Sequence, residues 1–133
     1  MRCLIVDDSP RFLDAARSLL ERQGIMVVGA ALTSAEALER AAALRPDVTL
    51  VDIDLGGESG LELARQLCRS GIVAPSCLIL ISAHAEEDFV DLIAASTAAG
   101  FLPKSALCAG AIRALLGPCG GDPVDPVSGP QGT

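Results

Sequence analysis

The chain has no tryptophan, no tyrosine and only one histidine, His84, in 133 residues. Without tryptophan or tyrosine, no pair of large aromatic rings can enclose a flavin. A single histidine without clustered cysteines also excludes a site for a metal that prefers nitrogen or sulfur ligands. Lysine and arginine together number ten, against 17 acidic residues, which gives a net charge of −7. Because nucleic-acid phosphates are bound by clustered cations, we expect no nucleic-acid contact by this domain itself.

Long apolar runs are missing as well. None approaches the roughly 20 residues of a membrane span, and acids appear too early at the N-terminus for a signal peptide. The five cysteines form no C-x-x-C motif, which favours reduced thiols in a cytoplasmic protein. We therefore expect one cytoplasmic domain without a membrane partner.

Five short apolar runs alternate with amphipathic stretches, a pattern typical of an α/β domain with a parallel sheet. The expected helices begin at Pro10 after a Ser9 cap, after Thr33 in a capping box with Glu36, near Ser59, and at residues 86 and 105. The expected strands cover residues 3–6, 25–30, 48–52, 77–82 and 100–102.

The end of the sequence has a different composition. Residues 118–133 are mostly glycine, proline and small polar residues, with too little apolar surface to offset the entropy of ordering. We expect a folded domain over residues 1–117, followed by a disordered tail or the start of a linker.

Polar residues stand at the ends of four expected strands. Five such units most often form a doubly wound five-stranded sheet of strand order 2-1-3-4-5, with ligands bound at its carboxyl edge. Asp7 and Asp8 follow the first strand, Asp52 ends the third, Ser82 ends the fourth and Lys104 follows the fifth. We expect all five side chains to meet at that edge.

Three carboxylates this close repel one another unless a cation compensates them, and Mg²⁺ suits an all-oxygen set. A carboxylate beside Mg²⁺ can attack phosphorus and form an aspartyl phosphate. In this interpretation Asp52 is the nucleophile, and Asp7 and Asp8 hold the metal. Lys104 pairs with the phosphoryl group, and Ser82 offers it a hydroxyl.

Four motifs carry a family resemblance: "LIVDDSP", "PDVTLVDIDLGGESGLEL", "LILISAH" and "AAGFLPKS". In this order and spacing, residues 1–117 resemble the receiver domain of a two-component response regulator, with a CheY-like fold. The resemblance implies a phosphoacceptor signalling domain rather than an enzyme. Asp52 would take a phosphoryl group from a histidine of a sensor kinase, in a Mg²⁺-dependent reaction, and the domain would assist its own phosphorylation and dephosphorylation.

The resemblance also implies roles for neighbouring residues. The Asp54 backbone carbonyl would be a further metal ligand. Ser82 and Phe101 would act as switch residues that change the surface of the fourth helix, fifth strand and fifth helix. Asp54 and His84 would tune the lifetime of the phosphoryl group. Glu58, in contrast, is interpreted from its position as a charge favoured at a helix start.

The motif "GFLPKS" resembles the NarL/LuxR-type branch, whose regulators usually carry a C-terminal helix-turn-helix. We therefore expect a transcriptional output, either from a single-domain regulator or from the receiver part of a longer transcription factor, with dimerisation on activation as one option. Three residues depart from the family. Gly56 replaces a common proline and predicts a freer loop, Phe101 replaces a tyrosine, and Ser105 replaces a proline, which leaves the isomer of the Lys104–Ser105 bond open.

Three other functions share parts of this pattern. A protein–protein module that no longer uses phosphate would have the same fold, but all five pocket residues are present here. The "DID" sequence resembles the D-x-D signature of haloacid-dehalogenase-type phosphatases, with Asp54 as general acid; that motif normally follows the first strand rather than the third. An FMN carrier would need a phosphate cradle after the first strand, where "DDSP" is hostile to phosphate.

Overall fold

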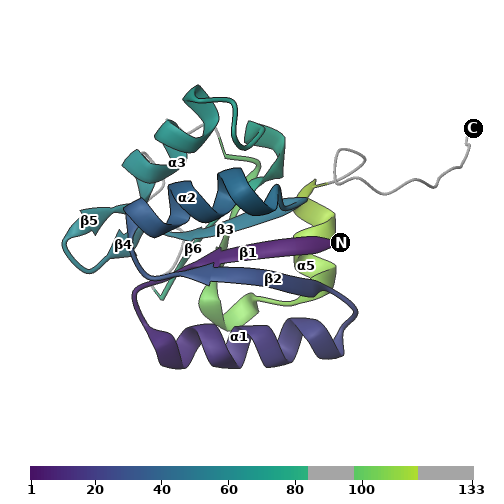
Figure 1. Cartoon of the computed structure of the whole chain (residues 1–133). Coiled ribbons are helices and arrows are strands. Elements are labelled where there is room, and N and C mark those ends of the chain that lie inside the picture. The colour runs from purple at the N-terminus through teal and green to yellow at the C-terminus, as the bar shows by residue number, and fades with distance from the viewer. Residues whose placement is uncertain (84–97, 117–133) are drawn as a thin grey trace, which may run out of the picture.

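The computed structural model describes residues 1–83 and 98–116, which form a parallel sheet with helices on both faces (Figure 1). The strand order is β2-β1-β3-β6-β7, which confirms the predicted 2-1-3-4-5 order. The predicted helix over residues 86–97, His84 and the predicted tail 118–133 lie outside the described residues. The strands are β1 (Arg2–Val6), β2 (Met26–Ala31), β3 (Val48–Asp52), β6 (Leu78–Ser82) and β7 (Gly100–Pro103).

The central strands are continuous apolar runs because the sheet is covered on both faces. Every residue of β3 and β6 is buried, and so are four of the five residues of β1. Strands buried on both faces lose the alternating polar pattern of a half-exposed sheet. This is why short apolar runs located these strands to within one or two residues.

Side-chain caps fix the first three helices, α1 (Pro10–Arg22), α2 (Ser34–Leu44) and α3 (Gly60–Arg69). Ser9 Oγ accepts from the Phe12 N–H at 3.3 Å, as predicted, and Thr33 Oγ1 accepts from the Glu36 N–H at 3.2 Å. The return bond of the predicted capping box differs: Glu36 Oε1 accepts from the N–H of Leu32, at 2.8 Å. The Glu36 side chain therefore binds the N–H of the residue before the N-cap, not the N–H of the N-cap Thr33 itself.

The last helix begins later than predicted. A short 3₁₀ turn, η3 (Lys104–Ala106), stands where the helix was expected to start, and α5 covers Ala109–Leu116. Leu107 between them has an extended backbone and buries its side chain in the core beside α1, so the helix cannot run through it. Gln23 Oε1 accepts the Ala109 N–H at 2.6 Å and caps the new start.

The core has two layers, one on each face of the sheet. In Figure 1, α1 and α5 lie on one face, and α2 and α3 lie on the other. Leu20 of α1 and Ile112 of α5 pack with Leu50 of the sheet, whereas Leu63 and Leu67 of α3 pack with β-strand residues on the opposite face. No helix among residues 1–83 and 98–116 is long and apolar enough to cross a membrane.

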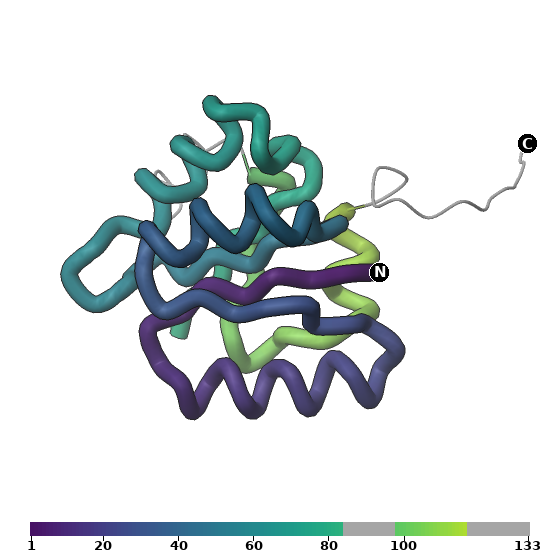
Figure 2. Tube along the Cα trace, viewed as in Figure 1, coloured from purple at the N-terminus to yellow at the C-terminus, as the bar shows by residue number. Residues whose placement is uncertain are grey.

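A small hairpin projects from the carboxyl edge of the sheet, as the Cα trace in Figure 2 shows. Its strands are β4 (Asp54–Leu55) and β5 (Glu58–Ser59), which pair antiparallel across Gly56 and Gly57. The loop after β3, predicted to be freer in its backbone than with a proline, is a two-residue turn in which both glycines have positive φ angles. A Gly-Gly pair between short strands is itself a hairpin signal, because such turns need positive φ angles.

Candidate functional site

The register of the sheet brings the predicted polar residues to one edge. Val6 pairs with Val51, so Asp7 and Asp52 leave neighbouring strands at the same level. Asp52 pairs with Ile81, and Ser82 pairs with Pro103, the residue before Lys104. The strand order and register therefore bring Asp52 to one site with Asp7, 45 positions before it, and with Lys104, 52 positions after it.

Lys104 lies between two buried carboxylates. Its Nζ is 2.5 Å from Asp7 Oδ2 and 3.0 Å from Asp52 Oδ2. The exposed fraction of the side chain is 0% for Asp7, 6% for Asp52 and 19% for Lys104. The ammonium also lies 4.4 Å from the centroid of the Phe12 ring, a cation–π contact that sequence reasoning missed.

Backbone N–H groups orient the other oxygen of each carboxylate. Asp7 Oδ1 accepts from the N–H of Ser9 at 2.8 Å, and Asp52 Oδ1 accepts from the N–H of Asp54 at 3.1 Å. Each carboxylate therefore has one oxygen on the backbone and one facing Lys104. This arrangement keeps both Oδ2 atoms directed into the site.

Burial governs the ionisation of the site. Desolvation raises the pKa of Asp52 from 3.8 to about 6, against the lowering effect of the Asp54 N–H and of Lys104; the Asp7 charge adds to the increase. For Lys104, burial lowers the pKa, but the hydrogen bonds and charges of Asp7 and Asp52 outweigh it, so the pKa is raised. Asp52 is thus a carboxylate whose charge is incompletely compensated by the protein.

Three acids can hold a cation together. Asp7, Asp8 and Asp52 each offer one carboxylate oxygen, and these atoms lie within 4.8 Å of one another. Apart from the Lys104 ammonium, Asp7 Oδ2 has no partner among the described residues, although it is fully buried. Asp8 is exposed and leaves the site open to solvent. An all-oxygen set with one open side fits a hard divalent cation such as Mg²⁺.

The remaining predicted residues are placed as follows. Ser82 is 1% exposed at the end of β6, and Phe101 is 7% exposed, packed into the core on the α2 and α3 face. The Asp54 side chain is not directed at the site: its Oδ1 accepts from the N–H of Gly56 at 3.2 Å. The Lys104–Ser105 bond is trans, as are all peptide bonds of the described residues.

Glu58 is a charge at a helix start, as predicted. It lies in β5, and its Oε1 accepts from the N–H of Ser34, the first residue of α2, at 2.9 Å. It therefore satisfies a free N–H in the first turn of α2, not of α3. This contact spans 24 residues of sequence and ties the β4–β5 hairpin to a helix on the same face.

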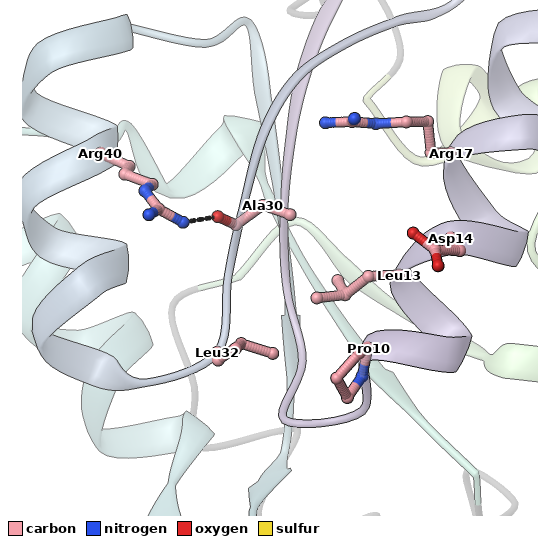
Figure 3. Close-up of a pocket in the computed structure, with 7 residues that line it drawn as sticks. All are labelled: Pro10, Leu13, Asp14, Arg17, Ala30, Leu32 and Arg40. Atoms are coloured by element: carbon pink, nitrogen blue, oxygen red, sulfur yellow. Dashed lines mark hydrogen bonds between the residues drawn. The ribbon is translucent and has the colours of Figure 1, made fainter.

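A separate hollow of about 230 Å³ lies between α1 and the β2–α2 segment (Figure 3). In this view Leu13 and Leu32 lie below the guanidinium groups of Arg17 and Arg40. Arg40 is already engaged, because it donates to the Ala30 carbonyl and lies 3.8 Å from Glu36. The hollow contains none of Asp7, Asp8, Asp52, Ser82 and Lys104, so it is distinct from the acidic site.

Comparison with known proteins points to one family. Residues 3–113 match the family described as the response regulator receiver domain. Response regulator GacA from Pseudomonas viridiflava is 35% identical over 117 residues, which make up 86% of this chain and 53% of that protein. The chain spans about half the length of the curated relative it matches.

Two solved structures share the fold. The receiver domain of NarL from Mycobacterium tuberculosis matches with a TM-score of 0.73 at 35% identity, over 90% of this chain and 94% of that chain. Response regulator TrrA from Thermotoga maritima, solved in complex with Mg(2+)-BeF, matches with a TM-score of 0.67 at 25% identity, over 79% of this chain and 87% of that chain. These matches confirm the predicted fold class.

Proposed function

Because the chain belongs to the family of response regulator receiver domains, we propose that Asp52 accepts a phosphoryl group from a histidine of a sensor kinase. Response regulators of this kind are phosphorylated by histidine kinases, and the family assignment confirms the predicted resemblance. The observation that carries the assignment to Asp52 is its place at the end of β3. There it lies between Asp7 of the β1 edge and Ser82 of the β6 edge, with Lys104 at 3.0 Å.

In the proposed reaction, Asp52 Oδ2 attacks phosphorus, an oxygen–phosphorus bond forms, and the phosphorus–nitrogen bond to the donor histidine breaks. Lys104 then changes partner from Asp52 to the phosphoryl oxygens, because the product places more negative charge on them than the carboxylate had. Asp7 keeps the ammonium in the site throughout, since its Oδ2 lies 2.5 Å from Nζ. The Ser82 hydroxyl offers a hydrogen bond to the same oxygens.

We propose that Asp7, Asp8 and Asp52 hold Mg²⁺, with the Asp54 backbone carbonyl as a further ligand. When bound, the cation neutralises charge on the transferred phosphoryl group. The support is the 4.8 Å cluster of carboxylate oxygens and the Mg(2+)-BeF complex of the Thermotoga maritima neighbour. On this proposal Asp8→Ala weakens Mg²⁺ binding, because it removes the most accessible carboxylate.

The output is proposed from the family. Phosphorylation would shift Ser82 and Phe101 and change the surface formed by the fourth helix, β7 and α5, as a population shift between two states. We assign residues 1–117 to the receiver and 118–133 to a tail or linker, with dimerisation and a transcriptional effector domain as the means of output. His84 and Asp54 stay predicted tuning residues for the lifetime of the phosphoryl group.

The direct experiment is incubation of the chain with a small phosphodonor, such as acetyl phosphate, and MgCl₂, followed by intact-mass measurement. We expect one phosphoryl group on the wild type, none on Asp52→Asn, and none when a chelator removes Mg²⁺. A wild-type chain that never gains mass, while still binding its kinase, would instead identify a phosphorylation-independent interaction module.

A further inference from the structure

Gly56 lies directly beside the carboxylate of Asp8. Its φ angle is +67°, and a Cβ atom placed on it would lie 2.7 Å from Asp8 Oδ2, 3.5 Å from Cγ and 3.7 Å from Cβ. A separation of 2.7 Å is below any normal carbon–oxygen contact. The glycine at position 56 therefore leaves the space that the Asp8 carboxylate occupies.

The turn that carries Gly56 is held on both sides. The Gly56 N–H donates to Asp54 Oδ1 at 3.2 Å, and Glu58 on the returning strand accepts from the Ser34 N–H at 2.9 Å. Asp8, in contrast, is exposed, and no hydrogen bond to its carboxylate is found among the described residues. A methyl group at position 56 would therefore displace the Asp8 carboxylate rather than the hairpin.

We propose that Gly56 is a positioning residue: it sets the place of the Asp8 carboxylate and thereby the affinity of the site for a divalent cation. This inference rests on the proposed cation site of Asp7, Asp8 and Asp52. A shared cation requires an oxygen of each carboxylate to face one point, and in the structure these oxygens lie within 4.8 Å of one another. Rotation of Asp8 away from a side chain at position 56 breaks that cluster without disturbing the core.

Gly57 provides a matched control in the same turn. Its φ angle of +129° is also unfavourable for other residues, but a Cβ there meets nothing within 4 Å. Gly57→Ala thus strains the hairpin backbone without touching Asp8. A purely structural role of the turn predicts that both alanine variants affect Mg²⁺ binding, whereas the positioning role predicts an effect of Gly56→Ala alone.

The experiment is a titration of the full chain with MgCl₂, in which binding is measured by calorimetry or by amide chemical shifts. The proteins compared are the wild type, Gly56→Ala, Gly57→Ala, Asp8→Ala and the Gly56→Ala/Asp8→Ala double variant. We expect Gly56→Ala to weaken Mg²⁺ binding about tenfold, as loss of a group that orients a ligand does. Gly57→Ala should stay near the wild-type affinity. In the Asp8→Ala background, Gly56→Ala should have no further effect, because the two changes act through one carboxylate.

Gly56→Asn is the second variant if Gly56→Ala does not fold, because asparagine tolerates this backbone conformation and carries the same Cβ. Wild-type affinity in the folded Gly56 variants would overturn the inference, and so would an equal loss in the Asp8→Ala background. A wild-type chain that binds no Mg²⁺ would reject the proposed site and this inference together. If the wild type binds Mg²⁺ and the Gly56 variants bind it equally well, only this inference is rejected.

Discussion

The Lys104 ammonium nitrogen lies 3.0 Å from Asp52 Oδ2. Lys104 is the only lysine in the sequence. The same nitrogen lies 2.5 Å from Asp7 Oδ2. It therefore bridges two carboxylates whose side chains are buried. The site is therefore compensated by one protein cation against two buried carboxylates and one exposed one. This imbalance determines how the domain should respond to pH, to mutation and to Mg²⁺.

The ionisation of Asp52 predicts a pH-dependent stability. Because its pKa is about 6 in the native chain and 3.8 in the reference state, the native chain binds more protons than the unfolded chain between these values. Stability from this group therefore increases as the pH falls through 6 towards 4. In chelator, the unfolding free energy of the wild type minus that of Asp52→Asn should rise by on the order of 1–3 kcal/mol between about pH 7 and pH 4. Urea unfolding at a series of pH values measures this difference, and a constant difference would contradict the raised pKa.

Replacing Lys104 should destabilise the cation-free domain. Lys104→Met leaves Asp7 and Asp52 facing each other without a counter-charge, so we expect a loss of about 2 kcal/mol or more. Added MgCl₂ should stabilise this variant more than the wild type, since the cation takes over the missing compensation. Urea unfolding with and without MgCl₂ tests both expectations.

Arg65→Met is the matched control, because the Arg65–Glu62 pair at 2.9 Å is exposed on both sides. Exposed pairs contribute little, so its unfolding free energy should change by no more than about 0.5 kcal/mol. If Lys104→Met were as mild as this control, the ammonium would not be compensating buried charge.

A buried hydroxyl offers a test away from the acidic site. Thr49, the second residue of β3, is fully buried, and its Oγ1 has no hydrogen-bond partner among the described residues. Thr49→Val keeps the shape and removes the unsatisfied polar atom, so it should stabilise the domain by about 1 kcal/mol. Thr33→Val, which removes the cap of α2, should destabilise it by about 1 kcal/mol. A loss of stability in Thr49→Val would show that its hydroxyl has a partner.

The sequence was sufficient to predict the sheet and the convergence at its edge. Strands β1, β3 and β6 are mostly apolar because their residues, apart from Arg2, are buried, and their order follows from the rule for parallel connections. Once the order is known, the residues after each strand must meet. Asp52 and Lys104 were therefore predictable although 52 positions separate them.

The features that were missed depend on contacts between distant segments. The start of α5 is set by Gln23, 86 residues before Ala109, and by burial of Leu107. The partner of Glu58 is Ser34 of α2, and no local pattern in either segment indicates that pairing. The β4–β5 hairpin was missed for a different reason: the adjacent Gly56 and Gly57 are a local hairpin signal, but they were interpreted as a freer loop.

Chemical mapping of the phosphorylated residue tests the central claim most directly. The chain is treated with acetyl phosphate and MgCl₂, the acyl phosphate is reduced with borohydride, and the modified residue is located by peptide mass spectrometry. We expect reduction at Asp52 alone. Modification at Asp7, Asp8 or Asp54, or a chain left unmodified at Asp52 after exposure to both donor and cation, would contradict it.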